Sequence, residues 1–282
     1  LLAINPKQIE ILCKPSKIAN RRIKANHITF SNNNVIMRRF YHPDALKLNQ
    51  ITSLTEVASH HATNVMRLKL SNKIILFNND AYDFGAEIIR IGKNKVEVVI
   101  QSKIANHNDS DLRIRLIQSM SSTEKMDWII QKSVELGVHV IVPIFSQRSI
   151  IKLTNDRAEK KLFHWKQIIQ SACEQCGRSK VPEIFIPKKI DLFWSNENIS
   201  SKEHLKLILS PLAKNSLHTI PTVKPSTIDI MIGPEGGFTE EEIVIAEKNG
   251  FIPIGLGPRI LRTETAPLAM LALLQYKYGD IA

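Results

Sequence analysis

From residue 112 onward, stretches with the pattern of a β-strand alternate with stretches with the pattern of an α-helix. Strands that alternate with helices in this way form a parallel sheet that is covered by helices on both faces. We therefore predict an α/β domain over residues 109–282. Its expected strands are 112–117, 139–145, 205–209, 228–232 and 251–256, and its expected helices are 121–137, 156–177, 239–250 and 265–278.

Two of these helices begin with the pattern of a capping box, in which a Ser or Thr and a Glu three residues later cap each other's backbone. The sequence has this pattern at Ser121–Glu124 and at Thr239–Glu242. Gly137 and Gly250 follow the two helices, and glycine is the residue that most often ends a helix. Local signals thus predict both ends of these two helices.

Residues 37–108 have a different pattern, because short β-type runs separated by turn signals recur at 73–77, 84–91 and 95–100. We predict a small β-rich barrel or sheet here, with a short helix over 60–70 whose exposed side is basic. The preceding residues 1–36 carry six basic side chains, one acidic side chain and little periodicity. We expect them to be an extension that is disordered or not native, with an organelle transit peptide as the alternative.

The chain is basic, with a net charge of +11 and a pI near 9.6. This imbalance favours a polyanionic partner such as nucleic acid, although a generally basic surface explains it equally well. No apolar run reaches membrane-spanning length, so no membrane partner is expected. Three cysteines and the lack of a signal-peptide pattern favour the reducing cytoplasm.

The pair Cys173 and Cys176 has the spacing of a zinc or redox motif. A structural zinc site needs four ligands, and the sequence has no second such pair and no paired His cluster. His60 and His61 are adjacent, so on a helix their side chains would point apart. We therefore expect packing cysteines and no metal.

Three loops at the predicted carboxyl ends of strands contain glycine or proline, and open α/β sheets bind ligands at that edge. These loops contain Ser210-Pro211, Gly233–Gly237 and Gly257–Arg259. None has the glycine spacing of a dinucleotide-binding fold or of a P-loop, so NAD, FAD and ATP are not expected. A plain tight turn explains any one such loop, but the last one runs into Arg262 and Glu264, charged residues that suggest a functional site.

Five longer motifs carry a family resemblance: RRFYHP at 38–43, EKMDWIIQKSVELG at 124–137, ACEQCGRSKVP at 172–182, IGPEGGFTEEEI at 232–243 and LGPRILRTETAPLAML at 256–271. Together they resemble the RsmE family, the 16S ribosomal RNA uridine-N3 methyltransferases of the SPOUT superfamily. The motifs occur in the family's order and cover the chain from Met37 onward.

The resemblance implies a PUA-like β-barrel for RNA contact at 37–108 and a SPOUT methyltransferase domain with a deep trefoil knot at 109–282. It also implies a homodimer, S-adenosylmethionine as the cofactor, and 16S rRNA of the small ribosomal subunit as the partner. The cofactor contacts that it implies are Leu209, Ser210, Gly233, Glu235, Gly236, Leu256, Gly257, Leu261, Arg262 and Thr265.

The implied reaction is methylation of uridine N3, which becomes a nucleophile only after it loses its imide proton. A positioned cation would stabilise the resulting anion, with Arg262 as the first candidate and Arg178 as the second. Glu264 is expected to orient an arginine or to accept the proton, and capping of the last helix explains it equally well. The side chains expected to hold RNA phosphates are those of Arg38, Arg39, Arg67 and Lys69.

Two other functions stay open at this point. One is a catalytically silent RNA-binding or ribosome-assembly factor, and the other is a related enzyme that methylates tRNA or a ribose. The predicted helix over 267–278 is apolar around more of its circumference than a one-sided surface helix needs. This favours either a homodimer contact or simple burial in the core.

Overall fold

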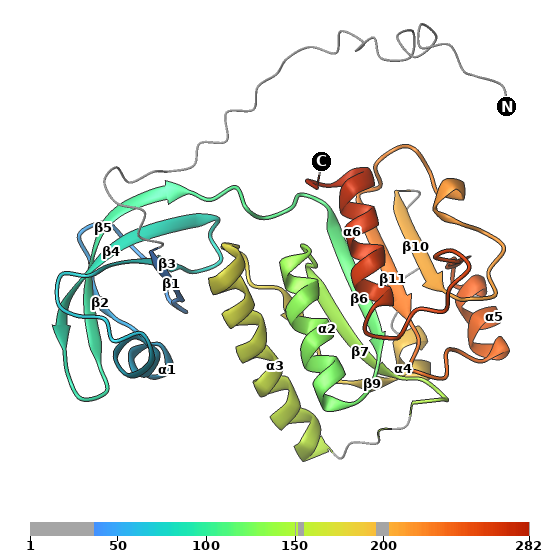
Figure 1. Cartoon of the computed structure of the whole chain (residues 1–282), viewed down its shortest axis with the longest axis horizontal. Helices are drawn as coiled ribbons and strands as arrows, with labels where there is room; N and C mark the ends of the chain where they lie inside the picture. Colours follow the sequence, from blue (N-terminus) through green and yellow to red (C-terminus); the bar gives the residue numbers. More distant parts are fainter. Residues whose placement is uncertain (1–36, 150, 152–154, 196–202, 282) are drawn as a thin grey trace, which may run out of the picture. The chain divides into compact units, whose positions relative to one another are not determined.

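A computed structural model gives the fold, and Figure 1 shows how its elements are arranged. The structure describes residues 37–149, 151, 155–195 and 203–281. The extension predicted at 1–36 lies outside the described residues. Among the described residues, no helix is both long and apolar enough to cross a membrane.

The amino-terminal part of the described chain is a five-stranded sheet in the order β1-β3-β4-β5-β2. Its strands are β1 (Arg38–Tyr41), β2 (Ile51–Ser53), β3 (Lys73–Phe77), β4 (Tyr82–Ile91) and β5 (Val96–Ala105). Strands β1 and β3 pair in parallel, and the other pairs are antiparallel. Every second side chain of β4 and β5 is buried over much of their length, as in a sheet with one covered face. The predicted small β-rich unit is confirmed.

The helix of this part lies earlier in the chain than the sequence predicted. It begins with α1 (Glu56–His60), capped by the Thr55 side chain, and continues as a π-helical turn, η2 (His61–Val65). The predicted helix over 60–70 is therefore wrong in its second half. Arg67 has a φ of 52°, a left-handed conformation that ends a helix.

The second sheet has seven strands, of which six follow the order β12-β10-β11-β6-β7-β8, while β9 also pairs with β7. The strands are β6 (Arg113–Ser119), β7 (Val140–Phe145), β8 (Glu183–Ile184), β9 (Lys188–Lys189), β10 (His204–Leu209), β11 (Thr227–Ile232) and β12 (Ile252–Ile254). All of their pairings are parallel, as the alternation of strands and helices predicted. The trefoil knot implied by the resemblance stays a prediction.

Helices cover both faces of this sheet, which confirms the predicted α/β architecture. They are α2 (Thr123–Glu135), α3 (Asn155–Cys176), α4 (Ile190–Ser195), α5 (Glu240–Lys248) and α6 (Ala266–Tyr278). Figure 1 shows α2, α3 and α6 side by side, and their buried residues share one apolar cluster with Leu116 and Ile230 of the sheet. The neighbouring Ile117 and Met231 point to the other face and pack in a second cluster with residues of α4 and α5.

One of the two predicted capping boxes is confirmed and the other is wrong. At α5, the Thr239 side chain accepts from the Glu242 backbone and the Glu242 side chain accepts from the Thr239 backbone. At α2, the N-cap is Ser122, and its side chain makes no capping hydrogen bond. The Ser121 hydroxyl instead donates to the Glu235 carboxylate, because the fold brings the loop after β11 next to it.

Within the described residues, hydrogen bonds also join the amino-terminal sheet to α3 and to the segment that follows α3. The backbone N–H of Tyr41 in β1 donates to the Glu174 carboxylate of α3 over 3.1 Å. The Asn79 side chain accepts from the backbone of Val181 at 2.6 Å. Burial raises the pKa of Glu174 above its usual value and outweighs the bond from Tyr41. The first strand is thus attached to the long helix of the second part.

Candidate functional site

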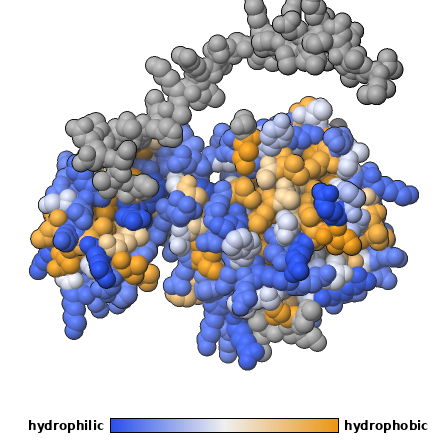
Figure 2. All heavy atoms as spheres, viewed as in Figure 1, coloured by the Kyte–Doolittle hydropathy of each residue, from blue (hydrophilic) through white to orange (hydrophobic). Residues whose placement is uncertain are grey.

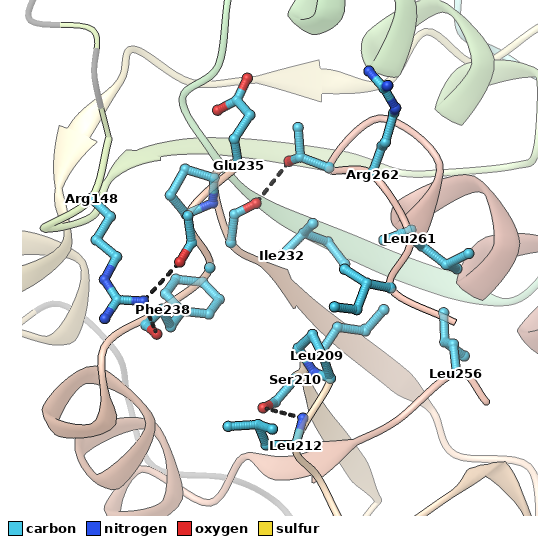
Figure 3. Close-up of a pocket in the computed structure, with 18 of the residues that line it drawn as sticks. Arg148, Leu209, Ser210, Leu212, Ile232, Glu235, Phe238, Leu256, Leu261 and Arg262 are labelled. Atoms are coloured by element: carbon cyan, nitrogen blue, oxygen red, sulfur yellow. Dashed lines mark hydrogen bonds between the residues drawn. The ribbon is translucent and has the colours of Figure 1, made fainter. Parts of the chain in front are cut away.

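A pocket of about 690 Å³ opens at the carboxyl ends of β10, β11 and β12. It lies at the edge where open α/β sheets bind their ligands. Three loops form most of its wall: 209–212 after β10, 232–238 after β11, and 256–263 after β12. Figure 3 shows the apolar side chains of Leu209, Ile232, Leu256 and Leu261 around it. These are the three loops that the sequence singled out.

The loop after β11 turns so tightly that its first position requires glycine. A Cβ atom on Gly233 would lie 3.1 Å from the backbone of Gly237 and of Phe238, closer than ordinary van der Waals contact. The backbone N–H of Gly237 donates to the carbonyl oxygen of Pro234 at 2.9 Å and closes the turn. The loop therefore presents backbone rather than side chains to the pocket.

Arg148, from the loop after β7, holds this glycine loop from outside. Its Nη1 donates to the carbonyl oxygen of Gly236 at 2.8 Å and to that of Phe238 at 3.5 Å, as Figure 3 shows. The adjacent backbone N–H of Gln147 donates to Glu242 at 2.8 Å. Arg148 lines the pocket, yet no local pattern of the sequence indicated it, because the contact joins residues about ninety positions apart.

A hydroxyl group ties the loop after β12 to the glycine loop. Thr263 Oγ1 donates to the carbonyl oxygen of Gly233 at 2.7 Å and accepts from Gln118 Nε2 at 3.3 Å. Gln118 is fully buried and Thr263 is only 6% exposed. The two loops therefore form one wall, with its hydrogen bonds shielded from water.

At the exit of β10, Ser210 serves the backbone. Its hydroxyl accepts from the backbone N–H of Leu212 at 3.3 Å, and its own N–H donates to the carbonyl oxygen of Ile254 at 3.1 Å. Ser210 is buried, whereas Leu212 is 87% exposed at the pocket's edge. The loop after β10 is thus held against β12.

Charged side chains gather on one side of the pocket. We call Ser121, Lys125, Glu235, Arg262 and Glu264 the rim cluster. Lys125 Nζ lies 2.9 Å from Glu235 Oε1 and 3.7 Å from Glu264 Oε2. Figure 3 shows Glu235 and Arg262 projecting to the same side, away from Ser210 and Leu212. Lys125 was missed by the sequence reasoning.

Two pKa shifts follow from the rim cluster. Partial burial disfavours the ionised form of Glu235, but hydrogen bonds from Ser121 and Lys125 outweigh burial and keep its pKa below the usual value. The hydrogen bond to Glu235 raises the pKa of Lys125, against the opposing positive charge of Arg262. Both groups are therefore charged at neutral pH.

The pocket brings together most of the residues predicted to contact a cofactor. All of them except Thr265 line it, namely Leu209, Ser210, Gly233, Glu235, Gly236, Leu256, Gly257, Leu261 and Arg262. Of the predicted catalytic residues, Arg262 lines the pocket, whereas Glu264 does not. Oε2 of Glu264 is buried and has no hydrogen-bond partner among the described residues.

The structure does not bring Arg178 to this pocket. Its guanidinium donates to Asp109 at 3.0 Å and to the carbonyl oxygens of Val134 and Val138 at 2.9 and 2.8 Å. The side chains of Arg178 and Asp109 are only 4% and 7% exposed. Arg178 thus links the end of α2 to the segment after α3.

The residues predicted to hold RNA phosphates differ in how free their side chains are. Arg38, Arg67 and Lys69 are exposed. Arg39 pairs with Asp83 at 2.5 Å and lies over the ring of Phe77, with 10% of its side chain exposed. Its guanidinium is therefore already committed to the protein.

The two cysteines of the CxxC pair are free thiols, and Cys173 is buried. Burial raises the pKa of Cys173 to about 12 and also raises that of Cys176. Within the ranges that the structure describes, no group of His, Cys, Asp and Glu side chains could hold a metal ion. Cys173 packs in the apolar cluster that α2, α3 and α6 share, and the expected absence of a metal stays a prediction.

Family models match both parts of the chain. An RNA methyltransferase domain matches residues 108–275, and an RNA methyltransferase PUA domain matches residues 54–101. The ribosomal RNA small subunit methyltransferase E of Buchnera aphidicola subsp. Schizaphis graminum is 41% identical over 86% of this chain and 98% of the relative. The protein of the same name from Bacillus subtilis is 30% identical over 80% of this chain and 90% of the relative.

Solved structures agree with this match. A putative methyltransferase of Legionella pneumophila in complex with the bound cofactor SAM has a TM-score of 0.83 and 40% identity, over 88% of this chain and all of that one. A ribosomal RNA small subunit methyltransferase E of Neisseria gonorrhoeae bound to S-adenosyl methionine has a TM-score of 0.80 and 39% identity, over 87% of this chain and all of that one. The family expected from the motifs is confirmed: this chain belongs to the ribosomal RNA small subunit methyltransferases E.

Proposed function

We propose that this chain transfers a methyl group from S-adenosylmethionine to N3 of one uridine in 16S rRNA of the small ribosomal subunit. The observation that carries the proposal is the pocket walled by the two glycine loops, which Thr263 ties together through Gly233. The same pocket is lined by nearly all the residues that the family motifs imply as cofactor contacts. Similar proteins from Legionella and Neisseria hold the cofactor.

The residues of the pocket fit S-adenosylmethionine in size and character. Small-molecule pockets have volumes of about 300–1,000 Å³, and this one has about 690 Å³. Apolar side chains such as Leu209 and Leu256 suit the flat adenine ring, and the Gly233–Gly237 backbone offers donors and acceptors. When bound, S-adenosylmethionine supplies an electrophilic methyl group on its sulfonium.

We assign Arg262 to the stabilisation of the target uridine during the reaction. Its side chain is exposed at the pocket and makes no hydrogen bond or ion pair with the described residues. Its charge stabilises the anion that forms when N3 of the uridine loses its proton to water. N3 would then bond to the methyl carbon as the bond from that carbon to the sulfonium sulfur breaks, which releases S-adenosylhomocysteine. A stacked or paired uridine must first turn out of its helix to expose N3.

Glu264 and Arg178 receive different roles. Glu264 does not line the pocket, and its Oε2 forms an ion pair with Lys125 Nζ at 3.7 Å. We therefore place Glu264 as a charge beside Lys125 and not as the proton acceptor. Arg178 is buried and bound to Asp109 and two carbonyl groups, so we assign it to holding the fold.

RNA binding falls to the exposed basic residues of the first sheet. We propose that Arg38, Arg67 and Lys69 hold phosphates that flank the target uridine. Arg39 supports this surface from below, because it is bound to Asp83. The cytoplasm, where ribosomal subunits assemble, is the proposed location.

We further propose that α6 forms the contact of a homodimer. Its Leu273 and Tyr276 are 42% and 72% exposed, while Leu271 and Leu274 are buried against the sheet. Figure 2 shows apolar residues at the surface over α6. An exposed apolar face of a helix that is also apolar toward the core favours a partner of its own kind.

The test combines cells and purified protein. Mass spectrometry of 16S rRNA from a strain that lacks the protein is expected to show one missing methyluridine. The purified chain should restore it on undermethylated small subunits with S-adenosylmethionine. Unchanged rRNA together with a lost tRNA or ribose methyl group would assign the chain to another substrate, and cofactor-independent RNA binding alone would make it a silent assembly factor.

A further inference from the structure

Arg262 forms no ion pair with either carboxylate of the rim cluster. Glu264 is only two positions away in the chain, and Glu235 projects to the same side of the pocket. A guanidinium and a carboxylate within reach of each other frequently form a bidentate pair. Among the described residues, however, the ion pairs of both Glu235 and Glu264 go to Lys125.

We propose that Lys125 is a positioning residue that occupies both carboxylates of the rim cluster and thereby leaves the Arg262 guanidinium free for the substrate. This inference rests on the proposed role of Arg262. Lys125 comes from the first turn of α2 and not from the loop that carries Arg262 and Glu264, so its position is set by the helix. Nothing in the family motifs assigns this task to it.

The two carboxylates do not depend on Lys125 equally. Glu235 also accepts a hydrogen bond from the Ser121 hydroxyl. Glu264 has Lys125 as its ion pair, and its buried Oε2 accepts no hydrogen bond from the described residues. A buried carboxylate oxygen without a partner is costly, so loss of the Lys125 charge leaves Glu264 in need of another cation.

Arg262 is the cation within reach. It is close enough to Lys125 for its positive charge to oppose that of the lysine. Its long side chain is exposed and can rotate without breaking a hydrogen bond to the described residues. In a chain that lacks the Lys125 ammonium, Glu264 therefore captures Arg262 and withdraws it from the reacting base.

The variant Lys125→Met tests this, because methionine keeps the length of the side chain and removes its charge. Its kcat for methyl transfer to undermethylated small subunits should fall about tenfold, with a smaller change in KM. Lys125→Arg should keep most of the activity. The matched control is Lys132→Met, which removes the charge of a lysine on the same helix that pairs with Glu135 at 2.8 Å, and it should leave kcat unchanged.

The decisive variant is the double substitution Lys125→Met with Glu264→Gln, which removes the competing carboxylate as well. We expect it to recover most of the kcat lost in Lys125→Met, since Arg262 is free again. A double variant as slow as Lys125→Met would overturn the proposal. So would a Lys125→Met variant as active as Lys132→Met.

A second measurement does not need methyl transfer at all. Phenylglyoxal modifies accessible arginines, and peptide mass spectrometry gives the rate at Arg262. The rate should fall several-fold in Lys125→Met and return in the double variant. Equal modification rates in the unsubstituted chain, Lys125→Met and the double variant would refute the role of Lys125, even if the chain methylates another RNA. If the rates differ as expected but the protein is inactive on small subunits, only the proposed substrate is contradicted.

Discussion

The hydroxyl of Thr263 donates a 2.7 Å hydrogen bond to the carbonyl oxygen of Gly233 and so joins the two loops that wall the pocket. The two residues are thirty positions apart and lie on loops that follow different strands. Gln118 of β6 donates to the same hydroxyl, so the bond lies where one strand and two loops meet. The shape of the pocket therefore depends on a side chain that does not itself carry charge.

The first prediction concerns this bond. Thr263→Val keeps the shape of the side chain and removes the hydroxyl, which leaves the Gly233 carbonyl without this donor and the Gln118 amide with the Ser119 carbonyl as its remaining acceptor. The variant should bind S-adenosylmethionine about fivefold more weakly, as expected for a loss of about 1 kcal/mol. Isothermal titration calorimetry measures the affinity. Thr219→Val, which removes a hydroxyl from an exposed turn, is the control and should bind normally; equal affinities would mean that the bond does not shape the pocket.

The second prediction separates the two arginines proposed from the sequence. Arg178→Ala leaves Asp109 buried without its cation and should lower the free energy of unfolding by about 3–5 kcal/mol. Arg262→Ala should leave the unfolding free energy nearly unchanged, because the side chain is exposed, and should lower kcat about a hundredfold. Urea denaturation and methyl-transfer assays give the two quantities. An Arg178→Ala protein of full stability but little activity would reverse the assignment.

The third prediction concerns the thiol of Cys173. With its pKa at about 12, roughly one thiol in ten thousand is ionised at pH 8, and the thiolate is the form that reacts. Iodoacetamide should therefore modify Cys173 very slowly in the folded chain at pH 8 and quickly in urea. The folded-state rate should rise as the pH is raised toward the pKa. Fast labelling of the folded protein at pH 8, seen by peptide mass spectrometry, would contradict a buried packing role.

The fourth prediction concerns RNA. Binding to a 16S rRNA fragment should weaken as salt rises, because phosphate contacts release counterions. Replacing the exposed Arg67 and Lys69 with alanine should make the plot of log affinity against log salt less steep, by about one unit of slope per residue. Lys248→Ala, an exposed charge on α5, is the control. An affinity that does not change with salt would exclude these contacts.

The local pattern of the sequence predicted the parallel sheet and most of its helices well. Alternating strands and helices from residue 112 onward sufficed. The strands are short, nearly continuous apolar runs because the sheet is covered on both faces, and they are separated by longer helical patterns. The short elements β8, β9 and α4 were missed, since six or fewer residues carry too little periodicity. The predicted capping box at Ser121 was wrong for a different reason. The Ser121 hydroxyl donates a hydrogen bond to the carboxylate of Glu235, which lies far along the chain.

The candidate site was predictable where its chemistry lies in the backbone. Gly233 and Gly257 mark turns that glycine permits, so the sequence alone points to their loops. Lys125 and Arg148 could not be found in this way, because each belongs to the site only through a contact with a loop far along the chain. Arg178 is the opposite case. Its place in a family motif suggested a catalytic role, but its side chain is buried and hydrogen-bonded inside the fold.

The pocket is completed by residues that are made late in synthesis. The loop that carries Thr263 and Arg262 comes after every strand of both sheets and is followed by α6. A nascent chain that has not yet reached this loop lacks one wall of the pocket and gains no stability from S-adenosylmethionine. S-adenosylmethionine thus stabilises only chains whose translation has passed this point. Shortened products lack this stabilisation and are more open to chaperones and proteases.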